Sequence, residues 1–303
     1  MAFVLAHLSD PHLAPLPEPS ARELIGKRIT GYLNWKRGRS HEHHRDVLDA
    51  LVADIHARNP DHIAVTGDLV NLALPAEFLP ARQWLASLGG AQDVTLVPGN
   101  HDAYARDTAH QHLTSWSGYM LGDGESNVTF PFVRRRGDIA LIGLSTAIPT
   151  LPIMATGTLG AEQIDALGSL LKKLGEQRLF RVILIHHPLQ ASNWHKRLTD
   201  ADALIATLRQ HGAELILHGH EHAHSTMWFD GPAGRIPALG IPSASAVDDG
   251  DHDPAAYHLL SIDRDGATWR CELTTRGCRP RKARSKIEPL GEIVELRRQR
   301  LIG

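Results

Sequence analysis

Short apolar runs alternate with amphipathic segments along the chain up to about residue 224. The runs that predict β-strands lie at Phe3–Leu8, His62–Thr66, Val94–Val97, Ile139–Leu144, Val182–Ile185 and Leu215–Leu217. Between them, apolar residues recur at helical spacing over residues 47–55, 78–88 and 164–174. Strands that alternate with helices are typical of parallel sheets joined by crossover connections. This part of the chain is therefore predicted to be α/β.

After residue 224 the helical spacing stops and further strand-like runs follow one another. They lie at Thr226–Phe229, Arg235–Leu239, Tyr257–Ile262 and Thr268–Leu273. Asp230-Gly231 and Asp265-Gly266 supply residues that tight turns prefer, so these runs are expected to pair antiparallel. No linker or internal repeat is visible, and one domain is expected over residues 1–275. Residues 276–303 are expected to form a basic C-terminal tail with a short helical stretch near its end.

Composition narrows the class of protein. The formal net charge of the 303 residues is −2, which argues against a protein dedicated to nucleic acid or to a membrane surface. Cys271 and Cys278 are too few for a disulfide framework, so a reduced cytosolic compartment is expected. Met1–His7 lacks a basic segment before its apolar residues and is predicted to be a strand, not a signal peptide. No apolar run approaches the roughly 20 residues of a membrane span. A cytoplasmic location is therefore predicted.

Polar segments rich in metal-ligand side chains follow five of the predicted strands. They are Asp10-Pro11-His12, Gly67-Asp68-Leu69-Val70-Asn71, Gly99-Asn100-His101-Asp102, His186-His187-Pro188 and Gly219-His220-Glu221-His222. Each segment alone is a weak signal, because Asp after a strand often caps the next segment. All five in this order predict one binuclear metal site.

Spacing divides the ligands into two groups. Asp10 and His12 lie two residues apart, and in an extended exit from a strand both side chains point to one side. The carboxylate of Asp68 has two oxygens and is expected to bridge two cations. The predicted ligands of one cation are Asp10, His12, Asp68 and His222. The predicted ligands of the other are Asp68, Asn100, His186 and His220.

Two side chains of these segments, His101 and Asp102, are expected to act in catalysis without binding metal. His101 is left without a metal and is expected to donate a proton, with Asp102 accepting a hydrogen bond from its ring and fixing the tautomer. Mixed carboxylate, amide and imidazole ligands suit two divalent or trivalent ions, Mn, Fe, Zn or Co. His187 is expected to point away from the site.

Most of the 20 histidines are not expected to be ligands. Those without a partner at a useful spacing are expected to be solvated or capping side chains. They are His7, His56, His62, His110, His112, His195, His211, His252 and His258.

The ordered motifs from Asp10 to His222 resemble the calcineurin-like metallophosphoesterase superfamily. Gly157-Thr158-Leu159 with Gln163 is also similar to the segment that precedes a crossover helix in that family. The resemblance implies a four-layer α/β/β/α sandwich of two mixed β-sheets flanked by helices, with metals in loops at the strand ends. It also implies that the site residues carry the roles given above.

Departures from the family pattern indicate a branch. The phosphate-binding arginines of phosphoprotein phosphatases are absent, since Pro98-Gly99 and Leu69-Val70-Asn71 occupy those places. Asn71 replaces the tyrosine of purple acid phosphatases, and His101 replaces the arginine of UDP-diacylglucosamine hydrolases. The chain therefore resembles the bacterial phosphodiesterase branch, which includes class III cyclic-nucleotide and glycerophosphodiester enzymes.

The predicted activity is hydrolysis of a phosphodiester by a metal-bridging hydroxide, with His101 acting on the leaving oxygen. The expected substrate is a small phosphodiester or a phospholipid-type molecule, and nucleic acid is not an expected partner. Competing hypotheses are a lipid-linked pyrophosphohydrolase, a nuclease that uses the basic tail, and a non-catalytic binding module. Residues 27–45 mix cations with Tyr32, Leu33 and Trp35, which leaves open a weak contact with a membrane surface or acyl chains.

Overall fold

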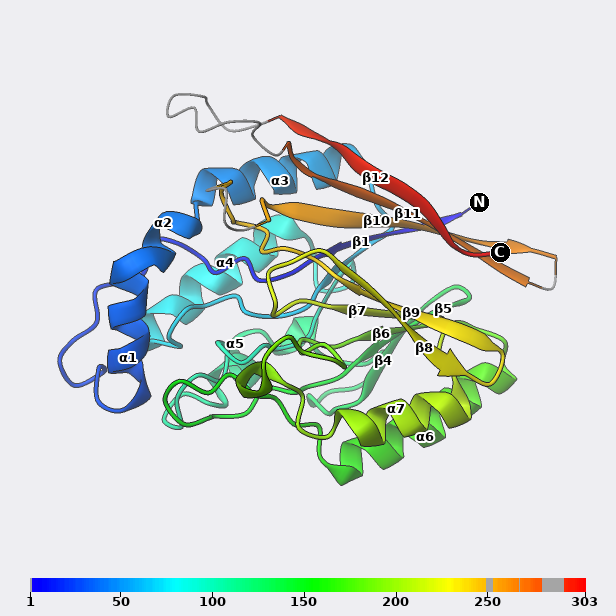
Figure 1. The fold of residues 1–303 in the computed structure, drawn as a ribbon, viewed down its shortest axis with the longest axis horizontal. Helices are drawn as coiled ribbons and strands as arrows, with labels where there is room; N and C mark the ends of the chain where they lie inside the picture. Colours follow the sequence, from blue (N-terminus) through cyan, green and yellow to red (C-terminus); the bar gives the residue numbers. More distant parts are fainter. Residues whose placement is uncertain (1, 249–252, 267, 280–291) are drawn as a thin grey trace.

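Two six-stranded sheets face each other in the computed structural model, which describes residues 2–248, 253–266, 268–279 and 292–303 (Figure 1). The first sheet has the order β12-β11-β10-β1-β2-β3 and the second β4-β5-β6-β7-β9-β8. The first consists of β1 (Phe3–Leu8), β2 (His62–Val65), β3 (Val94–Leu96), β10 (Ala256–Asp265), β11 (Thr268–Cys278) and β12 (Ile293–Ile302). The second consists of β4 (Phe132–Arg136), β5 (Ile139–Gly143), β6 (Phe180–Leu184), β7 (Leu215–His218), β8 (Ser225–Gly231) and β9 (Gly234–Gly240).

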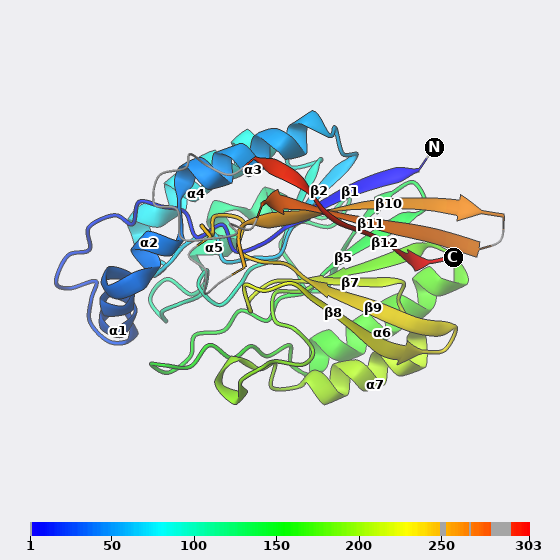
Figure 2. The same ribbon diagram turned by 45° about the horizontal axis from the view of Figure 1, so that its top comes forward.

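Helices cover the outer face of each sheet (Figure 2). On the first sheet they are α3 (Arg45–Ala57) and α4 (Phe78–Leu88), and on the second α6 (Ala161–Glu176) and α7 (Ala201–His211). The insert between β1 and α3 forms α1 (Lys27–Asn34), the π-helix η1 (Trp35–Arg39) and α2 (Ser40–Glu42). Shorter helices are η2 (Pro75–Glu77), α5 (Gln111–Ser115), η3 (Ser117–Tyr119) and η4 (Trp194–Lys196). The predicted four-layer sandwich is thus confirmed.

The alternation of side chains along the strands builds two cores. In β6, Val182 and Leu184 join the core between the sheets, while Ile183 packs with Leu167 and Leu204 of the outer helices. Strands whose two faces are both covered read as continuous apolar runs, which is why the sequence predicted them well. The strands that carry the five polar segments run parallel to one another within each sheet, β1-β2-β3 in the first and β6-β7 in the second. Their carboxyl ends therefore lie along one edge of the sandwich.

The end of the chain differs from its prediction. The helical stretch expected there is wrong, because Ile293–Ile302 forms β12 and pairs antiparallel with β11. Leu301 is buried in the large core, while the arginines of this edge strand lie at the surface. A charged edge strand has a composition similar to that of a solvent-exposed helix, so the sequence of this segment wrongly indicated a helix. The predicted boundary at residue 275 falls within β11, and residues 280–286 of the basic tail lie outside the described residues.

Other elements were not predicted from the sequence. β4, α1 and α7 have too few apolar residues in register to stand out. Among the described residues, no helix has the length and apolar character needed to cross a membrane.

Candidate metal centre

The loops after β1, β2, β3, β6 and β7 bring all seven predicted metal ligands together. Six of these side chains are buried: Asp10, His12, Asp68, Asn100, His186 and His220. The seventh, His222, keeps 20% of its side chain exposed and lies at the mouth of the site.

His12 and His222 meet Asp10 in a first cluster. Nε2 of His222 lies 3.2 Å from Oδ1 of Asp10 and 3.2 Å from Nε2 of His12. Nε2 of His12 lies 3.9 Å from the same Asp10 oxygen and 3.8 Å from Oδ2 of Asp68. Four nitrogen and oxygen atoms from three loops therefore face one small volume.

His186 stands at the centre of a second cluster. Its Nε2 lies 3.2 Å from Oδ2 of Asp68, 3.2 Å from Oδ1 of Asn100 and 3.2 Å from Nδ1 of His220. The Asp68 carboxylate therefore belongs to both clusters, as a bridging ligand must.

The backbone around the clusters is left-handed at several residues that are not glycine. The φ angles are 53° at Asp10, 37° at His12, 57° at Asp68, 73° at His220 and 53° at His222. The extended exit predicted for Asp10 and His12 is therefore wrong, because two left-handed residues, and not strand geometry, turn both side chains inward. Such conformations cost energy and tend to persist at functional sites.

Glycine permits the close approach of the loops. A Cβ on Gly99 would overlap the carboxylate of Asp68, and one on Gly219 would overlap Ser9 and Asp10. The glycines in these motifs therefore serve the packing of one loop against the next.

The second ring nitrogen of three histidines is fixed by a backbone carbonyl. Nδ1–H of His12 donates to Val70 at 3.3 Å, Nδ1–H of His186 to Thr66 at 2.6 Å, and Nε2–H of His220 to Lys196 at 3.1 Å. These bonds direct the other nitrogen of each ring into the clusters. Backbone partners of this kind are the usual support of metal-binding histidine.

The donor set fits two divalent cations. Oδ1 of Asp10 is buried and has no hydrogen-bond partner among the described residues, although ring nitrogens surround it. Burial raises the pKa of Asp68, but His186 and His101 outweigh it and hold that pKa well below its ordinary value. Burial lowers the pKa of His12 and of His220. The carboxylate is thus charged and these imidazoles neutral, the protonation states that bind metal.

His101 lies beside the clusters with a different partner from the one predicted. Its Nδ1–H donates to the carbonyl of Asn71 at 2.5 Å, and its ring stacks on Tyr104. Burial lowers the pKa of His101 to about 3, and nearby Arg39 acts in the same direction. The ring is therefore neutral, with Nε2 facing the site.

Asp102 anchors the two neighbouring loops. Its carboxylate accepts backbone N–H bonds from Asp68, Leu69, Val70 and Gly99 at 2.8–3.3 Å. The predicted bond to the ring of His101 is wrong, because the ring nitrogens of His101 meet the Asn71 carbonyl and Arg39 instead. Asp102 instead fixes the turn that carries Asp68.

The insert contributes two further side chains that sequence reasoning missed. Arg39 of η1 donates from Nη1 to Nε2 of His101 at 3.1 Å and lies 3.2 Å from Nε2 of His12 through Nη2. The buried His43 ring lies 4.6 Å from that of His12 and stacks on Trp35. The basic, aromatic character of the insert was the available signal, but it did not single out these residues.

The remaining predicted roles have mixed outcomes. His187 points away as expected, because its nitrogens meet Thr146 and the carbonyl of Ala155. Several histidines expected to be solvated or capping side chains are buried instead, namely His7, His62, His112 and His258. They pair with one another or with polar groups, as His7 does with Thr66 at 2.9 Å. His252 lies outside the described residues.

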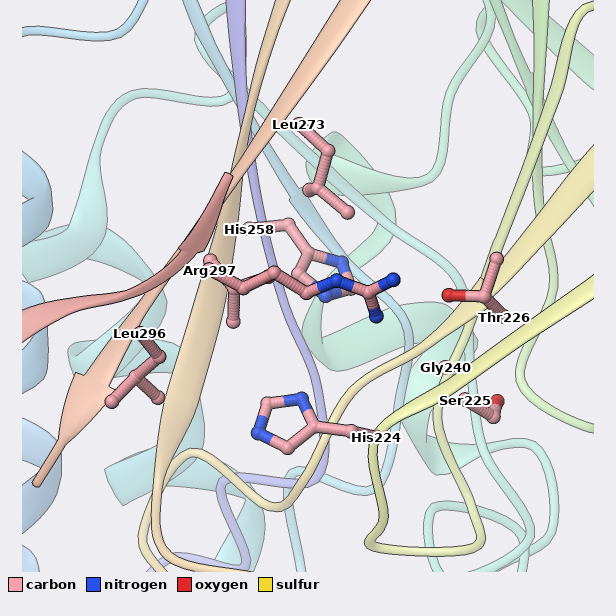
Figure 3. A pocket seen from close by; sticks show the side chains of 9 residues that line it. His224, Ser225, Thr226, Gly240, His258, Leu273, Leu296 and Arg297 are labelled. Carbon is pink, nitrogen blue, oxygen red and sulfur yellow. The ribbon is translucent and has the colours of Figure 1, made fainter. Parts of the chain in front are cut away.

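A cavity of about 690 Å³ opens between β8–β9 and β10–β12, away from the clusters. Figure 3 shows Arg297, His258 and His224 around it, with Leu273 and Thr226 on its walls. Its lining residues include none of the seven predicted ligands. It is therefore a space apart from the metal centre.

The two clusters share a carboxylate and lie at the strand ends of a two-sheet sandwich, an arrangement that suits two metal ions close together. The family model described as calcineurin-like phosphoesterase matches residues 3–224, and the chain belongs to this family. It is therefore a metal-dependent phosphoric ester hydrolase by family, as the motifs predicted.

Two curated relatives are similar in sequence. A probable cyclic nucleotide phosphodiesterase of Synechococcus sp. is 26% identical over 229 residues, which cover 74% of this chain and 80% of the relative. The glycerophosphodiester phosphodiesterase GpdQ of Enterobacter lignolyticus is 31% identical over 100 residues, which cover 33% of this chain and 30% of the relative.

Solved structures agree on the fold. A dimetal phosphatase of Danio rerio superposes with a TM-score of 0.62 at 14% identity, over 91% of this chain and 96% of the other. A purple acid phosphatase from yellow lupin seeds superposes with a TM-score of 0.57 at 13% identity, over 91% of this chain and 52% of the other.

Proposed function

We propose that the protein is a binuclear-metal-dependent phosphodiesterase. The observation that carries the proposal is Asp68, whose Oδ2 lies 3.8 Å from Nε2 of His12 and 3.2 Å from Nε2 of His186. One carboxylate thus faces a ring nitrogen of each cluster. The names of the two curated relatives, a cyclic nucleotide and a glycerophosphodiester phosphodiesterase, support a diester as substrate.

The proposed metal ligands are the seven side chains named from the sequence. Asp10, His12, Asp68 and His222 would hold one ion; Asp68, Asn100, His186 and His220 would hold the other. Ligands of this mixture suit Mn, Fe, Zn or Co. When bound, two such ions supply an ionised water near neutral pH and polarise the phosphoryl oxygens.

Arg39 is proposed to bind the phosphoryl group. The family positions that carry arginine in phosphoprotein phosphatases hold Pro98-Gly99 and Leu69-Val70-Asn71 here. The guanidinium of Arg39 reaches the same region from the insert, between His12 and His101. A planar fork of donors suits phosphoryl oxygens.

His101 is proposed to serve the leaving oxygen. Its Nδ1–H is fixed on the Asn71 carbonyl, so Nε2 is the atom available for proton transfer. A bound phosphoryl anion beside the ring raises the pKa of the imidazole, which opposes the effect of burial. Asp102 supports this site through Asp68, and a direct role in proton transfer is not proposed for it.

A panel assay tests the proposal. Hydrolysis of bis-p-nitrophenyl phosphate, p-nitrophenyl phosphate, cyclic AMP and glycerophosphodiesters is compared with added Mn. We expect diesters to be the better substrates and His101→Ala to lower kcat with metal content unchanged. Preference for the monoester over every diester would contradict the proposal.

A specific surface supports weak membrane contact as a second role. Ile25, Ile29 and Leu33 lie four residues apart around α1 and are 76%, 50% and 46% exposed. Trp35, expected to join this surface, is buried against His43 and does not. Sedimentation with anionic liposomes should weaken in Ile29→Ser/Leu33→Ser. The matched control is Leu79→Ser, on exposed Leu79 of α4, and equal binding by both variants would exclude this role.

A non-catalytic binding module and a nuclease both lack support. A non-catalytic module was expected to have lost ligands, whereas the seven side chains converge. For a nuclease, Arg298 and Arg300 of β12 lie close to Glu295 and Glu272, so these two arginines are partly neutralised. The cytoplasmic location stays a prediction.

A further inference from the structure

A small pocket adjoins the metal centre on the side of His101. It encloses about 210 Å³ between the insert and the loops after β2 and β3. Its lining residues include Asn100, a predicted metal ligand, with His101 and Arg39, and also Lys27, Tyr104 and Met154. Because His101 faces it, this pocket is where the group beyond the scissile bond would lie.

The residues that line the pocket carry positive charge and no carboxylate. Lys27 and Arg39 are its two cationic side chains, and neither Asp nor Glu is among the lining residues, all of which are described. Pockets with walls of one sign concentrate ligands of the opposite sign.

Lys27 is held in the pocket by neutral partners. Its Nζ donates to Oγ1 of Thr150 at 2.5 Å and to the carbonyl of Met154 at 3.0 Å, and lies 4.4 Å from the Tyr104 ring centre. Among the described residues it forms no ion pair. Burial lowers the pKa of Lys27 to about 8, with Asp68 as the one carboxylate that acts against it. Asp68 is already engaged by the ring nitrogens of the two clusters.

We infer that this pocket is the subsite for the leaving group, and that Lys27 selects a leaving group that carries its own carboxylate or phosphate. The inference rests on the proposed function. An ammonium that is partly removed from water without a counter-ion is costly, and an anionic group of the substrate would offset that cost. Hydrolysis forms one phosphorus–oxygen bond to water and breaks the one to the leaving oxygen, so the anionic group departs unchanged on the alcohol.

The size of the pocket limits the group. Drug-sized ligands occupy roughly 300–1,000 Å³, whereas this pocket has about 210 Å³. A short acid, with the charge one aromatic ring away from His101, is the class that fits. Tyr104 provides that spacing, since its ring stacks on His101 at 5.3 Å and lies beneath Lys27.

A matched pair of substrates tests the inference. Methyl 4-nitrophenyl phosphate and methyl 3-carboxy-4-nitrophenyl phosphate differ by one carboxylate on the leaving group. Their kcat/KM values are measured with the Mn-loaded protein and divided by the rates of the uncatalysed reactions. We expect the carboxylated ester to be favoured by about tenfold or more, as one hydrogen-bonded charge pair implies.

Three variants separate charge from structure. Lys27→Met should abolish the preference for the carboxylated ester, chiefly by lowering kcat/KM for that ester. Lys27→Arg should restore a preference. The control is Lys36→Met, since Lys36 is an exposed cation on the same insert. If Lys27 merely tied Met154 to α1, Lys27→Met would slow both esters equally.

The outcomes are decisive in each case. No preference in the wild type, or the same preference in Lys27→Met, overturns the inference. If the Mn-loaded protein hydrolyses neither ester, the proposed function fails. The inference about the pocket is then tested by the affinity of the protein for each ester. Calorimetric titration of the metal-free protein with each ester should then show tighter binding of the carboxylated ester, lost in Lys27→Met; equal binding of the two esters overturns the inference.

Discussion

Nε2 of His186 lies 3.2 Å from Oδ2 of Asp68, and the two side chains form a buried ion pair at the centre of the site. Burial lowers the pKa of His186, but the charge of Asp68 outweighs it and raises that pKa to about 9. The ring is therefore protonated at neutral pH before any metal arrives.

Metal binding at pH 7 should therefore release about one proton from His186, because the ion replaces the proton at Nε2. Calorimetric titration with Mn in buffers of different ionisation enthalpy measures this number. The slope of apparent enthalpy against buffer enthalpy should correspond to about one proton in the wild type and be smaller in His186→Asn. A slope of zero in the wild type would refute the ion pair.

Asp68→Asn should weaken both metal sites together. An amide offers one neutral oxygen, so it cannot serve two cations as the carboxylate does. We expect turnover to fall by more than about 100-fold, beyond the 10–100-fold typical of residues behind the ligands. Metal content by mass spectrometry decides the point, with the exposed Asp46→Asn as control. Two fully occupied ions in Asp68→Asn would show that the carboxylate is no bridge.

Asp102→Asn tests the anchor between the loops after β2 and β3. The amide nitrogen would face backbone N–H groups that now donate to the carboxylate. We expect the free energy of unfolding to fall by about 2 kcal/mol, the cost of buried donors left unpaired. Urea unfolding measures it. A variant of unchanged stability whose pH–rate profile has shifted would support the ring contact rejected above.

Arg39→Met should raise KM for diesters and leave both metals bound. We expect kcat/KM to fall by about 10–100-fold, since a charge-assisted hydrogen bond to the phosphoryl group is lost. Arg37→Met is the matched control, because Arg37 is an exposed cation of the same π-helix. Loss of metal in parallel with activity would place Arg39 in the support of His12.

His62 should make the fold sensitive to acid. Burial, with smaller contributions from Arg136 and Arg134, lowers its pKa from 6.5 to about 3. Between these values the unfolded chain binds a proton that the folded chain does not. The free energy of unfolding should therefore fall as pH falls from 6.5 to 3, by up to about 1.4 kcal/mol per pH unit for this group.

His62→Gln checks this assignment, because glutamine keeps a polar partner for Oγ1 of Thr95, which lies 2.7 Å from Nε2 of His62. Urea unfolding between pH 7 and 4 should show a shallower loss in the variant. His56→Gln, at an exposed histidine of α3, should keep the wild-type slope. Equal slopes in all three proteins would exclude His62 as a contributor.

The sequence predicted the parts of the site that follow buried strands. Asp10, Asp68 and His186 each come directly after an apolar run, so strand order alone places them at one edge. The fold could be predicted for the same reason, since strands covered on both faces appear in the sequence as continuous apolar runs.

What the sequence left out depends on tertiary placement. Arg39 and His43 enter the site because η1 and α2 bend back over it, and no periodicity encodes that bend. Asp102 follows His101 in the chain, yet its partners are backbone N–H groups of the loop after β2. β12 was missed because most of its side chains meet water, so its composition carries little information about its backbone.

The position of the insert between β1 and α3 has a consequence for the evolution of substrate preference. Its two basic residues in the pocket, Lys27 and Arg39, lie within thirteen consecutive residues, and neither belongs to a segment that supplies a predicted metal ligand. Exchange of this one segment would thus alter the proposed contacts to the leaving group and to the phosphoryl group, while the seven predicted metal ligands would stay unchanged. On these proposals, the side chains that contact the substrate and those that hold the metals come from separate stretches of the chain, so a new substrate preference could arise without loss of the metals.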